Sequence, residues 1–212
     1  MIKRELYMNR IRPFIGGELI KVMTGIRRSG KSVMLELIKE ELAEAGVAPS
    51  QMISINFEDM RYSHLQTATA LHDEIIKRAE GIKGKAYLFF DEIQEVEGWE
   101  KCVNSLRVAL DCDIYITGSN AKLLSGELAT YIGGRYVEFV IYPFSFAEFL
   151  ELYHTIAPSD SIQQCFQKYL LAGGMPYLAN LQYEEEPSRQ YLTDLFNSVQ
   201  LKDIVKRNKI RD

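Results

Sequence analysis

An eight-residue motif constrains the fold of this chain more than any other feature of its sequence. The segment Gly25-Ile-Arg-Arg-Ser-Gly30-Lys31-Ser32 fits the pattern G-x4-G-K-[ST], which connects a β-strand to the first turn of a helix. At ordinary amino-acid frequencies, a chain of this length contains the pattern by chance about once in a hundred times. The flanking residues agree with the motif, because they predict a strand at 18–24 and an amphipathic helix at 31–45.

The motif contains the groups that are needed to hold a phosphate. Its glycines let successive backbone N–H groups turn toward an anion, and the helix start adds unpaired N–H donors and a positive dipole end. Lys31 would supply charge to the β- and γ-phosphates, and the Ser32 hydroxyl would ligate Mg²⁺. The predicted nucleotide-binding residues are Gly25, Ile26, Arg27, Arg28, Ser29, Gly30, Lys31, Ser32 and Val33.

Two alternatives stay open for this segment. The motif could be an ordinary strand–turn–helix connection with an exposed lysine. Arg27 and Arg28 either touch phosphate or an acidic neighbour, or both project into solvent.

Two adjacent carboxylates, Asp91 and Glu92, follow an apolar run at 86–90 that is typical of a strand buried on both faces. Adjacent buried carboxylates repel each other and are costly to desolvate unless a cation or hydrogen bonds offset that cost. A bound Mg²⁺ would provide the offset. We therefore assign Asp91 to the magnesium sphere, through water, and Glu92 to polarising the attacking water. The alternative is a pair of exposed acids at the start of a loop.

The predicted elements alternate between strand and helix as far as residue 141. Because a helix, a strand and a second helix lie between Lys31 and Asp91, the acidic strand is the third in sequence, and we expect a strand inserted between the two motif strands. The alternation predicts an α/β fold, a three-layer αβα sandwich around a parallel sheet of about five strands. Further strands are predicted at 52–57, 113–117 and 136–141, and helices at 65–79, 99–110 and 121–128.

The character of the chain changes after Pro143, where only helices are predicted. They lie at 146–153, 162–172 and 191–206, and the acidic run at 184–186 is predicted to be a solvated loop. The expected domains are a P-loop core at 1–150, a helical lid subdomain at 151–200 and the start of a further region at 201–212.

Composition excludes several classes of protein. With 25 basic and 29 acidic residues among 212, the net charge of −4 gives no global attraction to nucleic acid, although the basic segment at 202–211 could form a local patch. No apolar run approaches the roughly 18 residues of a membrane span, and the N-terminus has no signal-peptide pattern. Cys102, Cys112 and Cys165 lack metal-site or disulfide spacing. We therefore expect a cytoplasmic protein.

The chain resembles the additional-strand P-loop ATPases of the AAA+ superclass. More narrowly, it is similar to prokaryotic AAA-domain ATPases that carry a C-terminal DUF4143 domain, which would continue past residue 212. The segments that carry the resemblance are GIRRSGKS (25–32), INFED (55–59), YLFFDEIQ (87–94), IYITGSNAKLLS (114–125), GGRYVEF (133–139), YPFSFAEFL (142–150) and AGGMPY (172–177).

The resemblance implies roles for residues that spacing alone does not reveal. A polar sensor of the γ-phosphate or attacking water would be Ser119 or Asn120, and the alternative is that these residues cap the next helix. Arg135 is similar in position to an arginine finger acting on a neighbouring subunit, and the alternative is a surface pair with an acid such as Glu138. The segment 173–176 resembles the start of a lid helix.

The sequence thus predicts a Mg²⁺-dependent ATPase. An N-K-x-D guanine-reading motif is absent, so ATP is preferred over GTP. The expected catalytic residues are Glu92, Lys31, Asn120 and Arg135, and the metal ligands are Ser32 and Asp91. The alternative is a nucleotide-gated binding module with slow or no hydrolysis, since no arginine precedes Arg189 in the lid to serve as a second sensor. The expected partners are ATP and ADP, a protein client, nucleic acid at the basic segment, and further copies of the chain.

Overall fold

The computed structural model describes residues 2–118 and 132–199, and the chain divides into two compact units. The first unit comprises Lys3–Ile26 and Lys31–Ile141 and contains the sheet. The second unit comprises the chain from Tyr142 onward, and Ile2 and Arg27–Gly30 are grouped with it.

Strands and helices alternate through the first unit, as the sequence predicts. The strands are β1 (Ile20–Thr24), β2 (Met52–Asn56), β3 (Ala86–Asp91), β4 (Cys112–Thr117) and β5 (Tyr136–Val140). The helices are α1 (Glu5–Ile11), α2 (Lys31–Glu44), α3 (Ala68–Ala79) and α4 (Trp99–Ala109). Short 3-10 helices are η1 (Arg12–Phe14), η2 (Pro49–Gln51), η3 (Met60–Leu65) and η4 (Ile93–Glu95).

The five strands form one parallel sheet in the order β2-β3-β4-β1-β5. This confirms the predicted α/β class and the predicted inserted strand, which is β4. Because neighbouring strands run in the same direction, their carboxyl ends lie along one edge of the sheet. The loop that follows β1 and the acids at the end of β3 therefore share an edge, with one strand between them.

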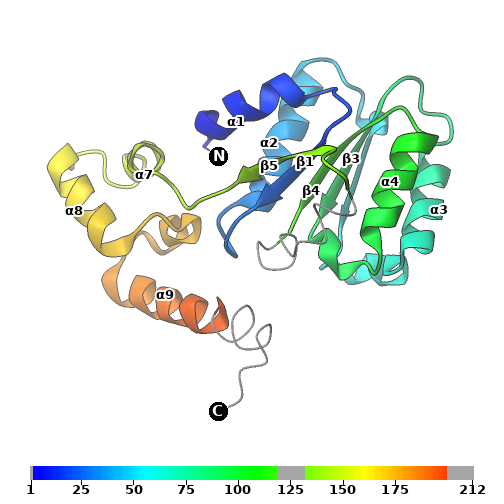
Figure 1. Ribbon diagram of the computed structural model, residues 1–212. Coiled ribbons are helices and arrows are strands. Elements are labelled where there is room, and N and C mark those ends of the chain that lie inside the picture. The colour runs from blue at the N-terminus through cyan, green and yellow to red at the C-terminus, as the bar shows by residue number, and fades with distance from the viewer. Residues whose placement is uncertain (1, 119–131, 200–212) are drawn as a thin grey trace, which may run out of the picture. The chain divides into compact units, whose positions relative to one another are not determined.

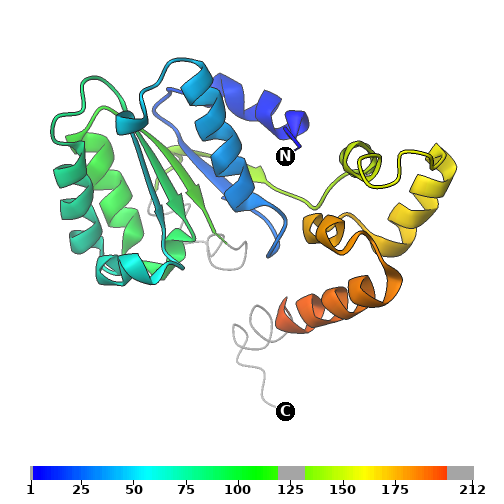
Figure 2. The ribbon, with the colours of Figure 1, turned by 180° about the vertical axis from the view of Figure 1, so that it is seen from behind.

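β3 explains why the sheet is covered by helices on both faces. Its side chains alternate between the faces, so Leu88 and Phe90 belong to one buried cluster and Phe89 to the other. α3 and α4 cover the first cluster, to which α3 contributes Ile75. α1 and α2 cover the second, to which α2 contributes Ile38. Figures 1 and 2 show these three layers from opposite sides.

The periodicity of the sequence does not predict α1. Its N-cap residue, Arg4, lies in the left-handed region and makes no side-chain capping hydrogen bond, and a seven-residue helix is marginal by itself. Burial stabilises it instead, because Met8 and Ile11 pack into the cluster beneath α2. The guanidinium of Arg12 also donates to the Glu41 carboxylate on α2, with Nε 2.8 Å from Oε1.

α3 begins three residues later than predicted. Residues 60–65 form the 3-10 helix η3, and the Thr67 side chain caps α3 by accepting a hydrogen bond from the backbone N–H of Ala70. A threonine at this position satisfies one of the helix's unpaired donors, so it marks the start of α3.

The second unit contains α7 (Phe146–Tyr153), α8 (Ile162–Ala172), the 3-10 helix η5 (Pro176–Leu181) and α9 (Glu185–Val199). Its core is aromatic: Phe149 stacks on Tyr153 at 5.1 Å between ring centroids and meets the edge of Tyr183 at 5.0 Å. Because Phe149 belongs to this core, α7 lies wholly in the second unit, and the units divide at Tyr142 rather than at residue 150 as predicted.

α9 begins inside the acidic run that the sequence predicts to be a loop, so that prediction is wrong. Glu185 and Glu186 occupy its first turn, where carboxylates interact favourably with the positive end of the helix dipole. Pro187 is tolerated there because the first-turn N–H groups have no partner within the helix. The predicted end of this helix at 206 lies outside the described residues.

The glycine pair at 173–174 forms a close backbone crossing. Phe144 N–H donates to the Gly174 carbonyl oxygen at 2.7 Å, and a Cβ at Gly174 would collide with the Phe144 carbonyl. Pro176 then occupies the first turn of η5, as the sequence predicts, but the element is a 3-10 helix. Within the described residues, no helix combines the length and apolar character that a bilayer crossing requires.

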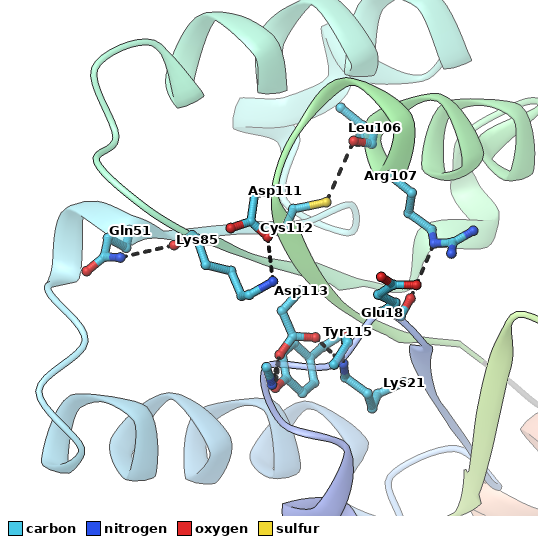
Figure 3. Close-up of polar contacts among 12 residues, drawn as sticks. Glu18, Lys21, Gln51, Lys85, Leu106, Arg107, Asp111, Cys112, Asp113 and Tyr115 are labelled. Carbon is cyan, nitrogen blue, oxygen red and sulfur yellow. Dashed lines mark hydrogen bonds and ion pairs between the residues drawn. The ribbon is translucent and has the colours of Figure 1, made fainter.

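A buried polar network lies near the amino ends of β1 and β4 (Figure 3). The ammonium of Lys21 contacts one Asp113 oxygen, and the other accepts from Tyr115 Oη at 2.7 Å and from Gly16 N–H at 2.6 Å. All three side chains are fully buried. Desolvation raises the pKa of Tyr115. Desolvation also lowers the pKa of Lys21, and the charge of Asp113 opposes this lowering. The network joins the segment before β1 to β4.

We expect Lys21→Met to lower the free energy of unfolding by about 3–5 kcal/mol, because it leaves the Asp113 carboxylate buried without its cation. Lys85→Met is the matched control: its ion pair with Asp111 is partly exposed, so its loss should cost less than about 1 kcal/mol. Urea unfolding followed by the fluorescence of Trp99, the chain's single tryptophan, measures both. Equal losses in the two variants would contradict this role for Lys21.

Candidate functional site

The candidate site lies at the carboxyl edge of the sheet, where ligands bind in open α/β folds. β1 ends at Thr24 and leads into the glycine-bearing motif, and β3 ends at Asp91. β4 separates these two strands and ends at Thr117. The three terminal side chains are all buried. A buried polar side chain thus ends each of three adjacent strands.

The backbone of the motif turns through conformations that favour glycine. Gly25 has a φ of 143° and Gly30 a φ of 100°, values that residues with a Cβ rarely adopt. α2 begins directly after Gly30, at Lys31. The positions of the two glycines therefore determine where the helix starts and where its first N–H groups lie.

The predicted phosphate-binding residues differ in exposure. Lys31 is only 5% exposed, and its ammonium donates to the carbonyl oxygens of Gly25 at 3.3 Å and Ile26 at 3.2 Å. The first turn of α2 carries no acidic side chain, so the lysine and the helix dipole together favour an anion here. The buried members of this set are Gly25, Ser29 and Lys31, and the half-buried members are Arg27 and Gly30. The exposed members are Ile26, Arg28, Ser32 and Val33.

Thr117 holds the two acids through a single hydroxyl group. Its Oγ1 donates to Asp91 Oδ1 and accepts from the backbone N–H of Glu92 at 3.0 Å. Glu92 has a left-handed backbone, with a φ of 54°, and this conformation directs the chain out of β3 into η4. Hydrogen bonding by Thr117 thus offsets part of the cost of burying Asp91, for which the sequence predicts a cation.

Glu92 also receives a side-chain hydrogen bond. Gln94, in η4, donates from Nε2 to Glu92 Oε2. Glu92 is half-buried. Its backbone is bonded to Thr117 on β4 and its side chain to Gln94 on η4. The sequence patterns did not indicate a role for Thr117 or Gln94. Two features of the sequence could have indicated them. Thr117 is a polar residue at the end of the strand predicted at 113–117, and Gln94 carries an amide two residues after Glu92.

Arg135 lies away from the site edge in its own chain. It precedes β5, at the amino end of a strand parallel to β1, and its carbonyl accepts the N–H of Ile20 at 3.0 Å. Its side chain is exposed. Glu138 accepts the Thr24 hydroxyl at 2.6 Å. The predicted sensors, Ser119 and Asn120, lie outside the described residues.

The donor groups at this edge fit Mg²⁺ better than a transition metal. Ser32 offers a hydroxyl oxygen and Asp91 a carboxylate, which are hard ligands that Mg²⁺ prefers. Among the described residues, no group of three His, Cys, Asp or Glu side chains could hold a metal ion. Mg²⁺ would therefore depend on phosphate and water for its remaining ligands, as is usual for this ion.

The fold and the site together define the class of protein. A parallel sheet with a strand inserted between β1 and β3, a glycine-bearing loop entering α2 and an acid pair after β3 make up the P-loop NTPase fold. The chain belongs to the AAA-domain family, whose model matches residues 18–150. Membership supports nucleotide binding at this edge of the sheet.

Two curated relatives are both longer than this chain. An uncharacterized protein of Haemophilus influenzae is 41% identical over 213 residues, which cover 100% of this chain and 52% of that protein. An uncharacterized protein of Methanocaldococcus jannaschii is 34% identical over 202 residues, which cover 91% of this chain and 43% of that protein. The chain therefore spans about half the length of the curated relatives it matches.

Among solved structures, the AMPPCP-bound DnaA from Aquifex aeolicus is similar in fold. The two chains share a TM-score of 0.53 with 14% sequence identity, over 98% of this chain and 66% of DnaA. Similarity at this level of identity shows a common fold alone.

Thr117→Val should lower the free energy of unfolding by about 1–3 kcal/mol, because it leaves a buried Asp91 oxygen and the Glu92 N–H without their partner. Thr117→Ser is the matched control, since it keeps the hydroxyl and should retain most of the stability. Urea unfolding monitored by Trp99 fluorescence compares the variants. If the valine variant were as stable as the serine variant, the hydroxyl would not hold the acids.

Proposed function

We propose that this protein is a Mg²⁺-dependent ATPase. One observation carries the proposal: the phosphate-binding motif after β1 and the Asp91–Glu92 pair after β3 lie at the same edge of the sheet, separated only by β4. That arrangement supports the proposal, because the reaction needs a phosphate-binding group beside groups suited to a metal ion and a water molecule.

Each residue has a distinct role in the proposed reaction. The backbone N–H groups of the motif and the Lys31 ammonium bind the β- and γ-phosphates and offset their charge. The Ser32 hydroxyl and, through water, the Asp91 carboxylate hold Mg²⁺, which supplies electrostatic stabilisation of the phosphates when it is bound. The Glu92 carboxylate orients the attacking water and accepts its proton.

The remaining roles rest on the family resemblance. We propose that Ser119 or Asn120 senses the γ-phosphate, and that Arg135 acts on the nucleotide of a neighbouring copy. The placement of Arg135 at the amino end of β5 favours action between copies over action within its own chain. The helical unit would act as a lid, and the additional length of the relatives is where we place a DUF4143-type domain and the protein or nucleic-acid client.

A second candidate function is a nucleotide-gated binding module that hydrolyses ATP slowly or not at all. The helical unit favours it, because the first arginine or lysine after Gly174 is Arg189. That guanidinium pairs with Glu186 on the same helix at 2.6 Å, and both side chains are largely exposed. A measurement of phosphate release beside the nucleotide content of the purified protein separates the two functions.

Lys31→Ala should weaken binding of an ATP analogue by about 10- to 100-fold, because it removes a charge-assisted hydrogen bond to phosphate. Isothermal titration calorimetry with Mg²⁺ present measures the affinity. Lys77→Ala is the control, since Lys77 is an exposed lysine on α3. Equal affinities for the two variants would overturn the assignment of the phosphate site.

Glu92→Gln should lower the rate of ATP turnover by about 10²–10⁴-fold while ATP binding is kept, because the amide cannot accept the proton of the attacking water. Chelation of Mg²⁺ should abolish turnover in the unaltered protein. A phosphate-release assay follows both, with the exposed Glu97→Gln as control. Turnover by Glu92→Gln at the unaltered rate would show that Glu92 is not the base.

A further inference from the structure

The amide of Gln94 has one group engaged and one group without a partner. Because an ionised carboxylate only accepts hydrogen bonds, the group that faces Glu92 Oε2 must be the NH₂ of Gln94. The Gln94 carbonyl oxygen, Oε1, is buried and has no hydrogen-bond partner among the described residues. The hydrogen bond to Glu92 therefore determines the orientation of the Gln94 amide, and the acceptor Oε1 has no donor in that part of the chain.

A buried amide oxygen without a donor is costly, so such an atom calls for an explanation. The neighbouring polar groups do not supply one. The Thr117 hydroxyl donates to Asp91, and the Glu92 N–H already donates to Thr117. The missing donor is expected to arrive with the ligands of the site.

From this arrangement, and resting on the proposed hydrolysis, we propose that Gln94 positions the attacking water together with Glu92. The Gln94 NH₂ group fixes the Glu92 carboxylate, and Gln94 Oε1 accepts a hydrogen bond from the same water molecule. Of the two hydrogens of that water, one is directed to the carboxylate and one to the amide oxygen. The oxygen lone pair is then left to face the γ-phosphorus.

The reaction balances without any chemical change in Gln94. The water oxygen forms a bond to the γ-phosphorus while the bond from that phosphorus to the β,γ-bridging oxygen breaks, and ADP leaves with the electron pair. The water proton passes to the Glu92 carboxylate. Gln94 only holds the water in line, so it is a positioning residue, and its loss should affect the rate rather than the binding of ATP.

The backbone supports this role, because a single buried residue, Ile93, joins Glu92 to Gln94. η4 begins at Ile93, which is fully buried, and the left-handed backbone of Glu92 is anchored to Thr117. The Glu92 backbone and the Glu92 carboxylate therefore each have a hydrogen-bond partner before any ligand arrives, which contributes to the preorganisation that positioning requires.

The test compares Gln94→Ala and Gln94→Met with the unaltered protein, in the presence of Mg²⁺. Methionine keeps the length and volume of the side chain without the amide, so it separates hydrogen bonding from packing. We expect both variants to lower kcat by about 10- to 100-fold with KM little changed. Gln163→Ala, an exposed glutamine on α8, should leave kcat unchanged.

A second readout does not depend on turnover. ADP with aluminium fluoride mimics the transferring phosphoryl group with its in-line water, whereas ADP with beryllium fluoride mimics bound ATP. Gln94→Met should weaken trapping of the aluminium fluoride complex by about tenfold and leave the beryllium fluoride complex unchanged. In the Glu92→Gln background, Gln94→Met should slow turnover little further, because both residues act on one water.

The outcomes separate this inference from the proposed function. Unaltered protein that binds no ATP overturns both, and unaltered protein that binds ATP without turning it over overturns the inference but leaves nucleotide binding standing. If the unaltered protein hydrolyses ATP and Gln94→Met keeps its kcat, the role of Gln94 is overturned and the ATPase assignment stands. Equal weakening of both fluoride complexes would also overturn it, since the residue would then affect nucleotide binding in general.

Discussion

A shared strand direction is the constraint on which the rest of this structure depends. Because β1, β4 and β3 are parallel neighbours, their last residues lie along one edge of the sheet. These residues are Thr24, Thr117 and Asp91. The motif before α2 and the acid pair after β3 are 60 residues apart, from Lys31 to Asp91, yet only one strand separates the strands that carry them. If β1 and β3 ran in opposite directions, the two motifs would lie at opposite edges of the sheet.

Buried acidic side chains at the two edges of the sheet have different partners. Near the amino edge, Lys21 and Asp113 neutralise each other, and Tyr115 and a backbone N–H satisfy the remaining acceptor. At the carboxyl edge, the buried Asp91 carboxylate accepts a hydrogen bond from the neutral hydroxyl of Thr117, and that bond does not offset a negative charge. The first arrangement is suited to stability and the second to receiving a cation.

Local patterns predicted much of the fold because the relevant forces act over short distances in sequence. The apolar run of β3 and the glycine spacing of the motif after β1 are complete within a few residues. The failures have the opposite origin. The N-cap residue of α1 makes no side-chain capping hydrogen bond, and the helix is stabilised by packing in the cluster that α2 also lines. The acids at 185–186 are favourable only once the chain there is helical.

By itself, the sequence determined the alternation of strand and helix, the glycine-bearing motif and the acid pair, because side-chain periodicity and glycine spacing are local properties. Only the tertiary structure decided that Thr117 joins Asp91 to Glu92 and that the Gln94 amide faces the Glu92 carboxylate. Those contacts depend on the register between β3 and β4 and on the turn of η4. Their geometry arises when the strands pair and helices close both faces, which no single segment of the chain specifies.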